Sequence, residues 1–285
     1  MSISVKNLTH IYNKGLAYEV KAVDDVSFDI ADAQLAGIIG HTGSGKSTLI
    51  QHLNGILKPD SGNIFINGTD ITAKSTKLYE IRKRVALVFQ YPEYQLFEET
   101  VALDVAFGPK NLGLREEEIH ERVKEALLLV GLNYSEFENR SPFELSGGQK
   151  RRVAIAGVVA MRPEILILDE PTAGLDPKAH DDILKMISEI RDKTQATIIL
   201  VSHNMGDIAS MADVVFVMDR GKLVKSGDPH EVFADSRFLS EIGLGLPPPA
   251  KFLELLATKG VDVPVSGSIL TQERLTEYLA GRLQV

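Results

Sequence analysis

The sequence predicts an α/β fold with a mostly parallel central sheet, and two observations lead to this prediction. Short apolar runs that suit buried strands alternate with helical patterns between residues 165 and 218. The stretch GHTGSGKS at residues 40–47 follows one such apolar run and precedes a helical pattern. Its glycines, lysine and serine have the spacing of a phosphate-binding loop, and a strand before it and a helix after it are the context that such a loop requires.

The N-terminal region favours antiparallel strands. Residues 3–8 and 22–30 alternate apolar and polar side chains, as half-buried strands do, and residues 63–68 form a short strand between two turns. We therefore expect an antiparallel β subdomain. Tyr12 follows the first strand, where its ring could stack on a nucleotide base or close the edge of the core.

The phosphate-binding loop connects a strand at residues 35–39 to a helix at residues 47–53, in which Leu49, Ile50 and Leu53 share one face. Its glycines let backbone N–H groups converge on phosphate oxygens, and the helix N-terminus adds its positive end. We expect Lys46 to neutralise the β- and γ-phosphates and Ser47 to offer its hydroxyl to Mg²⁺. The residues predicted to contact the nucleotide here are Gly40, His41, Thr42, Gly43, Ser44, Gly45, Lys46, Ser47 and Thr48.

A second apolar strand, at residues 165–168, ends in two carboxylates, Asp169 and Glu170. Open α/β sheets bind ligands at the carboxyl ends of their strands, so both acids are expected at the same edge as the phosphate loop. Asp169 is expected to hold Mg²⁺ and Glu170 to act as the general base that activates water. The sequence thus predicts a site for nucleotide hydrolysis.

Residues from about 99 to 160 have helical periodicity, which predicts an inserted helical subdomain. The charged run at residues 115–118 is expected on a solvated helix face. Within the subdomain a helix opens with Ser146, Gly147, Gly148 and Gln149, and this helix start could be a simple cap or a second phosphate site. Because one nucleotide needs only one cradle, we expect it to face the nucleotide of a second protomer.

Composition limits the remaining possibilities. The chain has 285 residues, a net charge of −8 and no cysteine, so a disulfide scaffold and thiolate metal sites are excluded and wrapping of nucleic acid is disfavoured. The N-terminus lacks a signal-peptide pattern, and no uncharged apolar run approaches the roughly 18 residues of a membrane span. We therefore expect a soluble protein.

The motifs described above occur together with Gln90, a loop at residues 174–176 and His203. Over about residues 1–233, their order resembles that of the ATPases of ABC transporters. This resemblance implies ATP and Mg²⁺, an ABC cassette built on the P-loop NTPase fold, and adenine stacking on Tyr12. It also implies that Gln90 binds Mg²⁺ and senses a transmembrane partner, that Asp176 organises the dimer contact, and that His203 touches the γ-phosphate. The catalytic residues expected from residues and resemblance together are Glu170, His203 and Gln90, and the metal ligands are Ser47, Gln90 and Asp169.

Two other classes of P-loop protein fit less well. A soluble ABC ATPase that acts on nucleic acid is the main alternative, but such proteins carry long heptad arms or two cassettes in one chain, and this sequence has neither. A small-molecule kinase would not explain residues 145–149 or His203.

A narrower resemblance lies in residues 89–101 and 104–111, which look like the ATPases of energy-coupling factor transporters, most like their second, A-prime type. These transporters import vitamins and transition-metal ions. The resemblance implies a peripheral subunit on the cytoplasmic face of the cell membrane, a paralogous ATPase partner, a transmembrane coupling subunit, a substrate-binding membrane subunit, and no nucleic acid. Four apolar side chains after Gln90 are expected to be exposed for docking: Tyr91, Tyr94, Leu96 and Phe97.

We expect two domains, an ATPase cassette at residues 1–234 and a C-terminal helical extension at residues 235–285. The extension carries one apolar helical stripe, made of Leu275, Tyr278, Leu279 and Leu283. This stripe could fold back onto its own cassette, or it could hold two ATPase subunits together. We expect the second arrangement, because the cassette is complete near Phe233.

Overall fold

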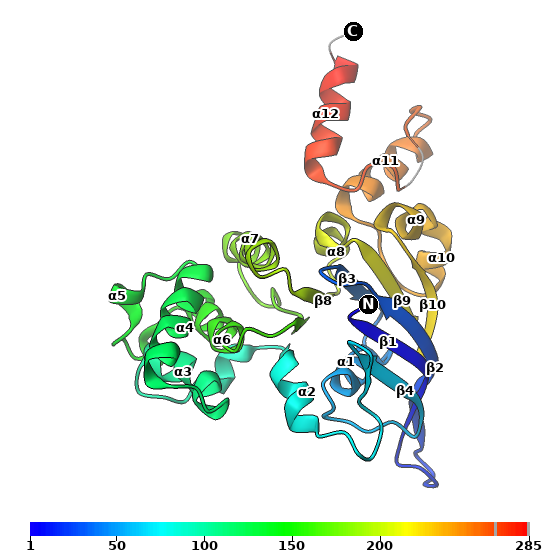
Figure 1. Cartoon of the computed structure of the whole chain (residues 1–285). Helices are drawn as coiled ribbons and strands as arrows, with labels where there is room; N and C mark the ends of the chain where they lie inside the picture. The colour runs from blue at the N-terminus through cyan, green and yellow to red at the C-terminus, as the bar shows by residue number, and fades with distance from the viewer. Residues whose placement is uncertain (265–266, 284–285) are drawn as a thin grey trace.

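Two sheets and a group of helices make up the fold in the computed structural model, which describes residues 1–264 and 267–283 (Figure 1). The larger sheet has the strand order β10-β9-β3-β8-β7-β6, and all neighbours are parallel except β10 and β9. Its strands are β3 (Leu35–Ile39), β6 (Val85–Val88), β7 (Ile165–Asp169), β8 (Thr197–Val201), β9 (Val214–Asp219) and β10 (Lys222–Gly227). Every residue of β3, β6, β7 and β8 is buried, as expected of a parallel sheet covered on both faces.

The smaller sheet is antiparallel, with the strand order β2-β1-β4-β5. Its strands are β1 (Ile3–Tyr12), β2 (Val20–Ile30), β4 (Ser61–Ile66) and β5 (Thr69–Asp70). Strand β1 is longer than predicted and includes Tyr12. Its register against β2 shifts three times between Val5 and Ile11, and such bulges break the alternation by which a strand is recognised.

Helices α3 to α6 gather in a subdomain to one side of the strands (Figure 1). The predicted mixed sheet, antiparallel β subdomain and helical subdomain are thus confirmed. The helices are α1 (Lys46–Leu53), α2 (Leu78–Arg84), η1 (Pro92–Gln95), α3 (Val101–Asn111), α4 (Glu116–Leu129), α5 (Tyr134–Phe137), η2 (Pro142–Glu144), α6 (Gly147–Val159), α7 (Pro177–Thr194), α8 (Met205–Met211), α9 (Pro229–Ala234), α10 (Ser236–Glu241), α11 (Pro248–Thr258) and α12 (Gln272–Leu283). None of the helices in this described part of the chain is both long and apolar enough to cross a membrane.

The core has two halves, one on each face of the larger sheet. Alternate residues of β7 contribute to different halves, because successive side chains of a strand point to opposite faces. Ile165 and Ile167 pack with the antiparallel sheet and α1, whereas Leu166 and Leu168 pack with the helices. The carboxyl edge of the sheet is thereby held rigidly between two packed layers.

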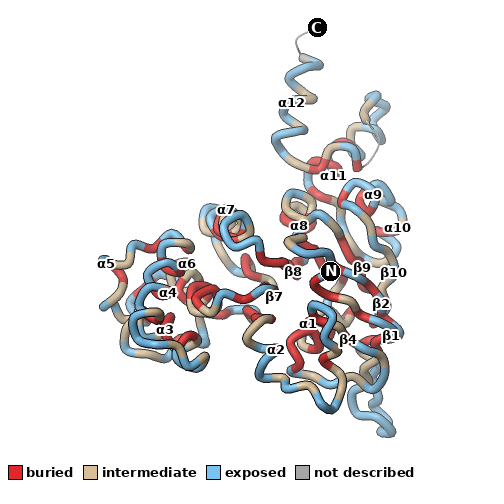
Figure 2. The backbone as a smooth tube through the Cα atoms, in the orientation of Figure 1, coloured by how far each residue is buried: buried red, intermediate tan, exposed pale blue. Residues whose placement is uncertain are grey.

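The region beyond residue 235 is partly packed and partly projecting. Leu239, Ala250 and Leu270 belong to the same core half as Leu166. Helix α12, in contrast, extends away from the rest of the chain and is largely exposed (Figures 1 and 2). Of the predicted stripe, Leu275, Tyr278 and Leu279 are half-buried, and the Leu283 side chain lies outside the described part.

Candidate functional site

A cavity of about 1060 Å³ opens at the carboxyl ends of β3, β7 and β8. It brings together most of the residues predicted to bind ATP and Mg²⁺, although they come from distant parts of the chain. Those that line it are Tyr12, Gly40, His41, Thr42, Gly43, Gly45, Lys46, Ser47, Thr48, Gln90, Asp169, Glu170 and His203.

The phosphate loop is packed so tightly that two of its glycines cannot be replaced. A Cβ atom on Gly40 would lie 2.4 Å from the Met218 carbonyl oxygen, and one on Gly45 would lie 2.2 Å from the Ala22 carbonyl oxygen. Gly45 also has a φ of +103°, which side chains disfavour. Ser44 does not line the cavity and is buried beneath it, and its hydroxyl has no hydrogen-bond partner among the described residues. The backbone N–H groups are therefore held in one arrangement before any ligand arrives.

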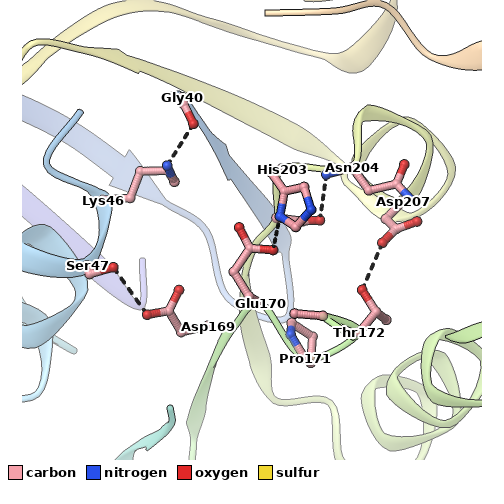
Figure 3. A network of polar contacts seen from close by, with 12 residues as sticks. Gly40, Lys46, Ser47, Asp169, Glu170, Pro171, Thr172, His203, Asn204 and Asp207 are labelled. Atoms are coloured by element: carbon pink, nitrogen blue, oxygen red, sulfur yellow. Dashed lines mark hydrogen bonds and ion pairs between the residues drawn. The ribbon is translucent and has the colours of Figure 1, made fainter. Parts of the chain in front are cut away.

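Lys46 carries its charge inside the loop. Its ammonium donates hydrogen bonds to the carbonyl oxygens of Gly40 at 2.7 Å and His41 at 3.0 Å (Figure 3). Burial lowers the pKa of Lys46, while Glu170 and Asp169 act in the opposite direction. A desolvated cation surrounded by oxygen dipoles binds an anion more strongly than a hydrated one.

Oxygen ligands for a divalent cation meet at the floor of the cavity. The Ser47 hydroxyl donates to Asp169 Oδ2 at 3.3 Å, and Gln90 lines the same cavity (Figure 3). Burial raises the pKa of Asp169, and the Ser47 hydrogen bond opposes that rise. Hydroxyl, amide and carboxylate oxygens fit Mg²⁺, which keeps several waters and shares the phosphates of its substrate. Among the described residues there is no cluster of three or more His, Cys, Asp or Glu that could hold a metal ion.

Glu170 and His203 form a pair at the mouth of the cavity. His203 Nδ1 lies 2.6 Å from Glu170 Oε2, within hydrogen-bond distance (Figure 3). Glu170 has a φ of +50°, a conformation that non-glycine residues rarely adopt, and its backbone N–H donates to Val201. The backbone and His203 together fix the direction in which this carboxylate points.

Tyr12 closes the far side of the cavity. Its hydroxyl lies 3.4 Å from Thr48 Oγ1, and its ring meets the edge of His10 with the ring centres 4.6 Å apart. These contacts fix the ring but leave it partly exposed. The arrangement suits stacking on a flat base.

The helix start at residues 146–149 lies elsewhere. Ser146, Gly148 and Gln149 line a separate cavity with Ala179, and Asp176 caps α7 without reaching the phosphate loop. Ser146 and Gln149 form a capping box, in which the Ser146 hydroxyl accepts from the Gln149 N–H. A Cβ atom on Gly147 would meet nothing within 4 Å, so packing within this chain does not require a glycine there.

Sequence reasoning missed a buried arginine that connects three segments. Arg151, on α6, forms two hydrogen bonds with Glu93 of η1, at 2.7 and 3.1 Å. It also donates to the carbonyl oxygens of Pro171 at 3.0 Å and Ala173 at 2.8 Å, just after Glu170. No local sequence motif predicts this contact, because Arg151 and Glu93 are 58 residues apart.

Sequence reasoning also missed several residues that line the main cavity. None of them belongs to a recognisable motif: Val20, Lys21 and Ala22 begin β2, Met205 begins α8, and the others are Arg220, Gly221, Gly243, Leu244 and Gly245. The last three belong to the C-terminal region, which therefore reaches the edge of the nucleotide cavity.

The predicted exposed cluster after Gln90 needs one correction. Tyr91, Tyr94 and Phe97 are exposed, but Leu96 is only 8% exposed and packs in the core. The prediction for Leu96 was wrong, because the chain turns after η1 and directs this side chain inward. The exposed Phe107 of α3 takes its place on the surface, with its ring edge-on to Phe97 at 5.0 Å. Next to this pair lies a largely apolar cavity of about 430 Å³.

Comparisons with known proteins show the family to which the chain belongs. The ABC transporter family model matches residues 23–173. The chain is 60% identical to the energy-coupling factor transporter ATP-binding protein EcfA2 of Clostridioides difficile strain 630, over 98% of this chain and 96% of that protein.

Solved structures give the same result. CbiO1 of Clostridium perfringens, described as part of the ABC transporter complex cbiONQ, is 38% identical with a TM-score of 0.75, over 88% of this chain and 98% of that one. The cassette MJ0796, in a dimer bound to ADP and phosphate, is 27% identical with a TM-score of 0.70, over 79% of this chain and 98% of that one. The chain therefore belongs to the ABC transporter ATPases and, within them, to the energy-coupling factor transporter ATP-binding proteins of the EcfA2 type.

Proposed function

We propose that this chain binds ATP with Mg²⁺ in the 1060 Å³ cavity and hydrolyses it on the cytoplasmic face of the cell membrane. Hydrolysis drives the import of a vitamin or a transition-metal ion through a transmembrane coupling subunit, and a separate membrane subunit binds the cargo. The observation that carries the proposal is the meeting of Lys46, Glu170 and His203 in one cavity. The description of CbiO1 as part of a transporter complex supports the assembly with membrane subunits.

The loop N–H groups and Lys46 hold the β- and γ-phosphates, and Tyr12 stacks on the adenine. Glu170, fixed by His203, takes a proton from water as the water oxygen bonds to the γ-phosphorus and the bond to ADP breaks. His203 touches the γ-phosphate with its other ring nitrogen. When bound, Mg²⁺ neutralises charge that develops on the phosphates, and Ser47, Gln90 and Asp169 are the residues that would hold it.

A second cassette completes the site. Ser146 and Asp176 lie outside the phosphate-loop cavity, so they serve the nucleotide of a facing protomer. Gly147 leaves open space that a γ-phosphate oxygen can enter. The dimers formed by the cassette MJ0796 support this arrangement. We propose a paralogous ATPase as the partner, with residues 1–234 as the cassette and residues 235–285 as the extension that holds the two subunits together.

Glu170→Gln tests the hydrolytic role. The amide cannot accept the proton, so phosphate release should fall about 10²- to 10⁴-fold while ATP still binds. Phosphate release and ATP affinity are measured on the transporter complex, which is purified with the full-length chain as bait. Glu121→Gln, on the exposed face of α4, is the matched control and should keep full activity. Turnover of Glu170→Gln at the unmodified rate would refute the proposal.

A further inference from the structure

A buried carboxylate lies where three segments from the carboxyl edge of the sheet meet. Asp207, on α8, is only 3% exposed. It accepts a hydrogen bond from the Thr172 hydroxyl at 3.2 Å (Figure 3). His180 Nε2, on α7, lies 2.9 and 3.1 Å from its two oxygens. Asp207 thus joins the segment after Glu170 to the first turns of α7 and α8.

The geometry favours a protonated ring on His180. Its second nitrogen, Nδ1, lies 3.1 Å from Asp181 Oδ1, so each ring nitrogen faces a carboxylate. Ionised carboxylates only accept hydrogen bonds, so this arrangement favours a proton on both ring nitrogens. Burial lowers the pKa of His180, but the hydrogen bonds and charges of Asp181 and Asp207 outweigh burial, and the net pKa is raised above 6.5.

Asp207 in turn depends on this cation. Burial raises the pKa of Asp207, and the charge and hydrogen bond of His180 act against that rise, with smaller help from Thr172 and His203. Removing one partner from a buried ion pair leaves an uncompensated charge, which is far more costly than losing an exposed pair. Asp181, which is largely exposed, cannot replace Asp207 as an anchor.

Both partners sit one helical turn from residues of the proposed mechanism. The His180 backbone N–H donates to the Asp176 carbonyl oxygen at 2.9 Å, so His180 moves with Asp176. Asp207 follows His203 by four residues and lies in the first turn of α8, the helix that His203 precedes. Neither His180 nor Asp207 lines the nucleotide cavity, so neither contacts the substrate there.

We propose that His180 is a positioning residue for ATP hydrolysis, whose ion pair with Asp207 holds the loop that carries Asp176 against the loops that carry Glu170 and His203. This inference rests on the proposed function, because the roles of those three residues belong to it. The pair makes catalysis depend on the protonation of a side chain that never meets ATP.

The sign of the pH effect follows from the raised pKa. The contribution of the ion pair is lost as the pH rises through the raised folded-state pKa of His180, and it is also lost as the pH falls through the raised pKa of Asp207, so it is greatest in the pH range between the two. The kcat of the unmodified complex should therefore fall as the pH rises above this range. His180→Arg keeps its charge throughout and should retain kcat to higher pH.

His180→Ala should lower kcat at every pH, by roughly 10- to 100-fold, while KM for ATP stays unchanged, because only the geometry of the loops is disturbed. A merely structural residue would not change the shape of the pH profile. All rates are measured on the transporter complex, which is purified with the full-length chain as bait. Unmodified kcat in His180→Ala, or an identical fall with pH in the His180→Arg and unmodified complexes, would overturn the inference.

If His180→Arg is inactive because arginine is larger than histidine, a double-mutant cycle tests the inference instead. His180→Ala, Asp207→Asn and the combined variant should show strongly non-additive losses of kcat, since the two residues act as one unit. Additive losses overturn the inference. If Glu170→Gln is inactive while His180→Ala has normal kcat, the inference is wrong but the proposed function stands. If Glu170→Gln hydrolyses ATP at the normal rate, the proposed function itself is wrong.

Discussion

The Lys46 ammonium is already oriented for binding a polyanion. It is held by two carbonyl oxygens of its own loop, which orient the charge but do not neutralise it. Phosphate oxygens that bind Lys46 therefore displace carbonyl dipoles, which bind the ammonium less strongly than an ionised counter-ion would. Burial lowers the pKa of Lys46, and the charges of Glu170 and Asp169 oppose that fall.

Lys46→Ala should weaken ATP binding itself. A charge-assisted hydrogen bond contributes about 1.5 to 3 kcal/mol, which corresponds to roughly a 10- to 150-fold loss of affinity. Isothermal titration with ATP measures the change, and Lys124→Ala, on the exposed face of α4, is the control. An unchanged Kd in Lys46→Ala would remove the phosphate role from this residue.

At the scale of elements, the segment from η1 to α3 presents an apolar surface made of Tyr94, Phe97 and Phe107. Tyr94 is 85% exposed, and the neighbouring cavity is lined mainly by apolar atoms. A protein rarely leaves such a cluster in water unless a partner covers it. Under the proposed function, the partner that covers this surface is the transmembrane coupling subunit.

The double variant Tyr94→Ser/Phe97→Ser should fold normally but fail to co-purify with the membrane subunits. Both side chains are exposed, so the unfolding temperature should hardly change. Affinity purification with mass spectrometry reports the partners, and Leu128→Ser, on an exposed part of α4, is the control. Leu96 is left intact, because replacing a buried leucine would destabilise the fold by about 2 to 5 kcal/mol. Normal recovery of the membrane subunits would exclude this surface as the docking site.

At the scale of the whole molecule, we propose that the projecting α12 contacts the partner ATPase whether or not nucleotide is bound. Ending the chain after residue 271 removes this helix and spares Leu239, Ala250 and Leu270, which a cut at residue 235 would remove from the core. The shortened chain should stay folded yet associate more weakly with its partner ATPase when ATP is absent.

Analytical ultracentrifugation of the two ATPases without nucleotide measures that association. Glu277→Ala on the exposed side of α12 serves as the control. Equal association of the shortened and full chains would show that α12 does not hold the subunits together.

The sequence predicted the sheets and the phosphate loop because their signals are local. A glycine-rich loop between strand and helix and two acids at a strand end need no knowledge of distant residues, and parallel strands bring such ends to one edge. The contacts of Arg151 with Glu93 and of His180 with Asp207 were not predicted, because each joins separate elements through side chains that form no motif. Leu96 was misplaced because exposure depends on the direction of the turn after η1.

The capping box at Ser146 has a consequence for how this residue can be probed. Its oxygen already accepts the Gln149 N–H, so the hydroxyl proton remains free to be donated outside the helix. One hydroxyl group can therefore cap the start of α6 and, under the proposed function, donate a proton to a ligand at the same time. Alanine would remove both roles together, whereas threonine preserves both, so neither substitution alone separates the stability of the helix end from the recognition of an anion.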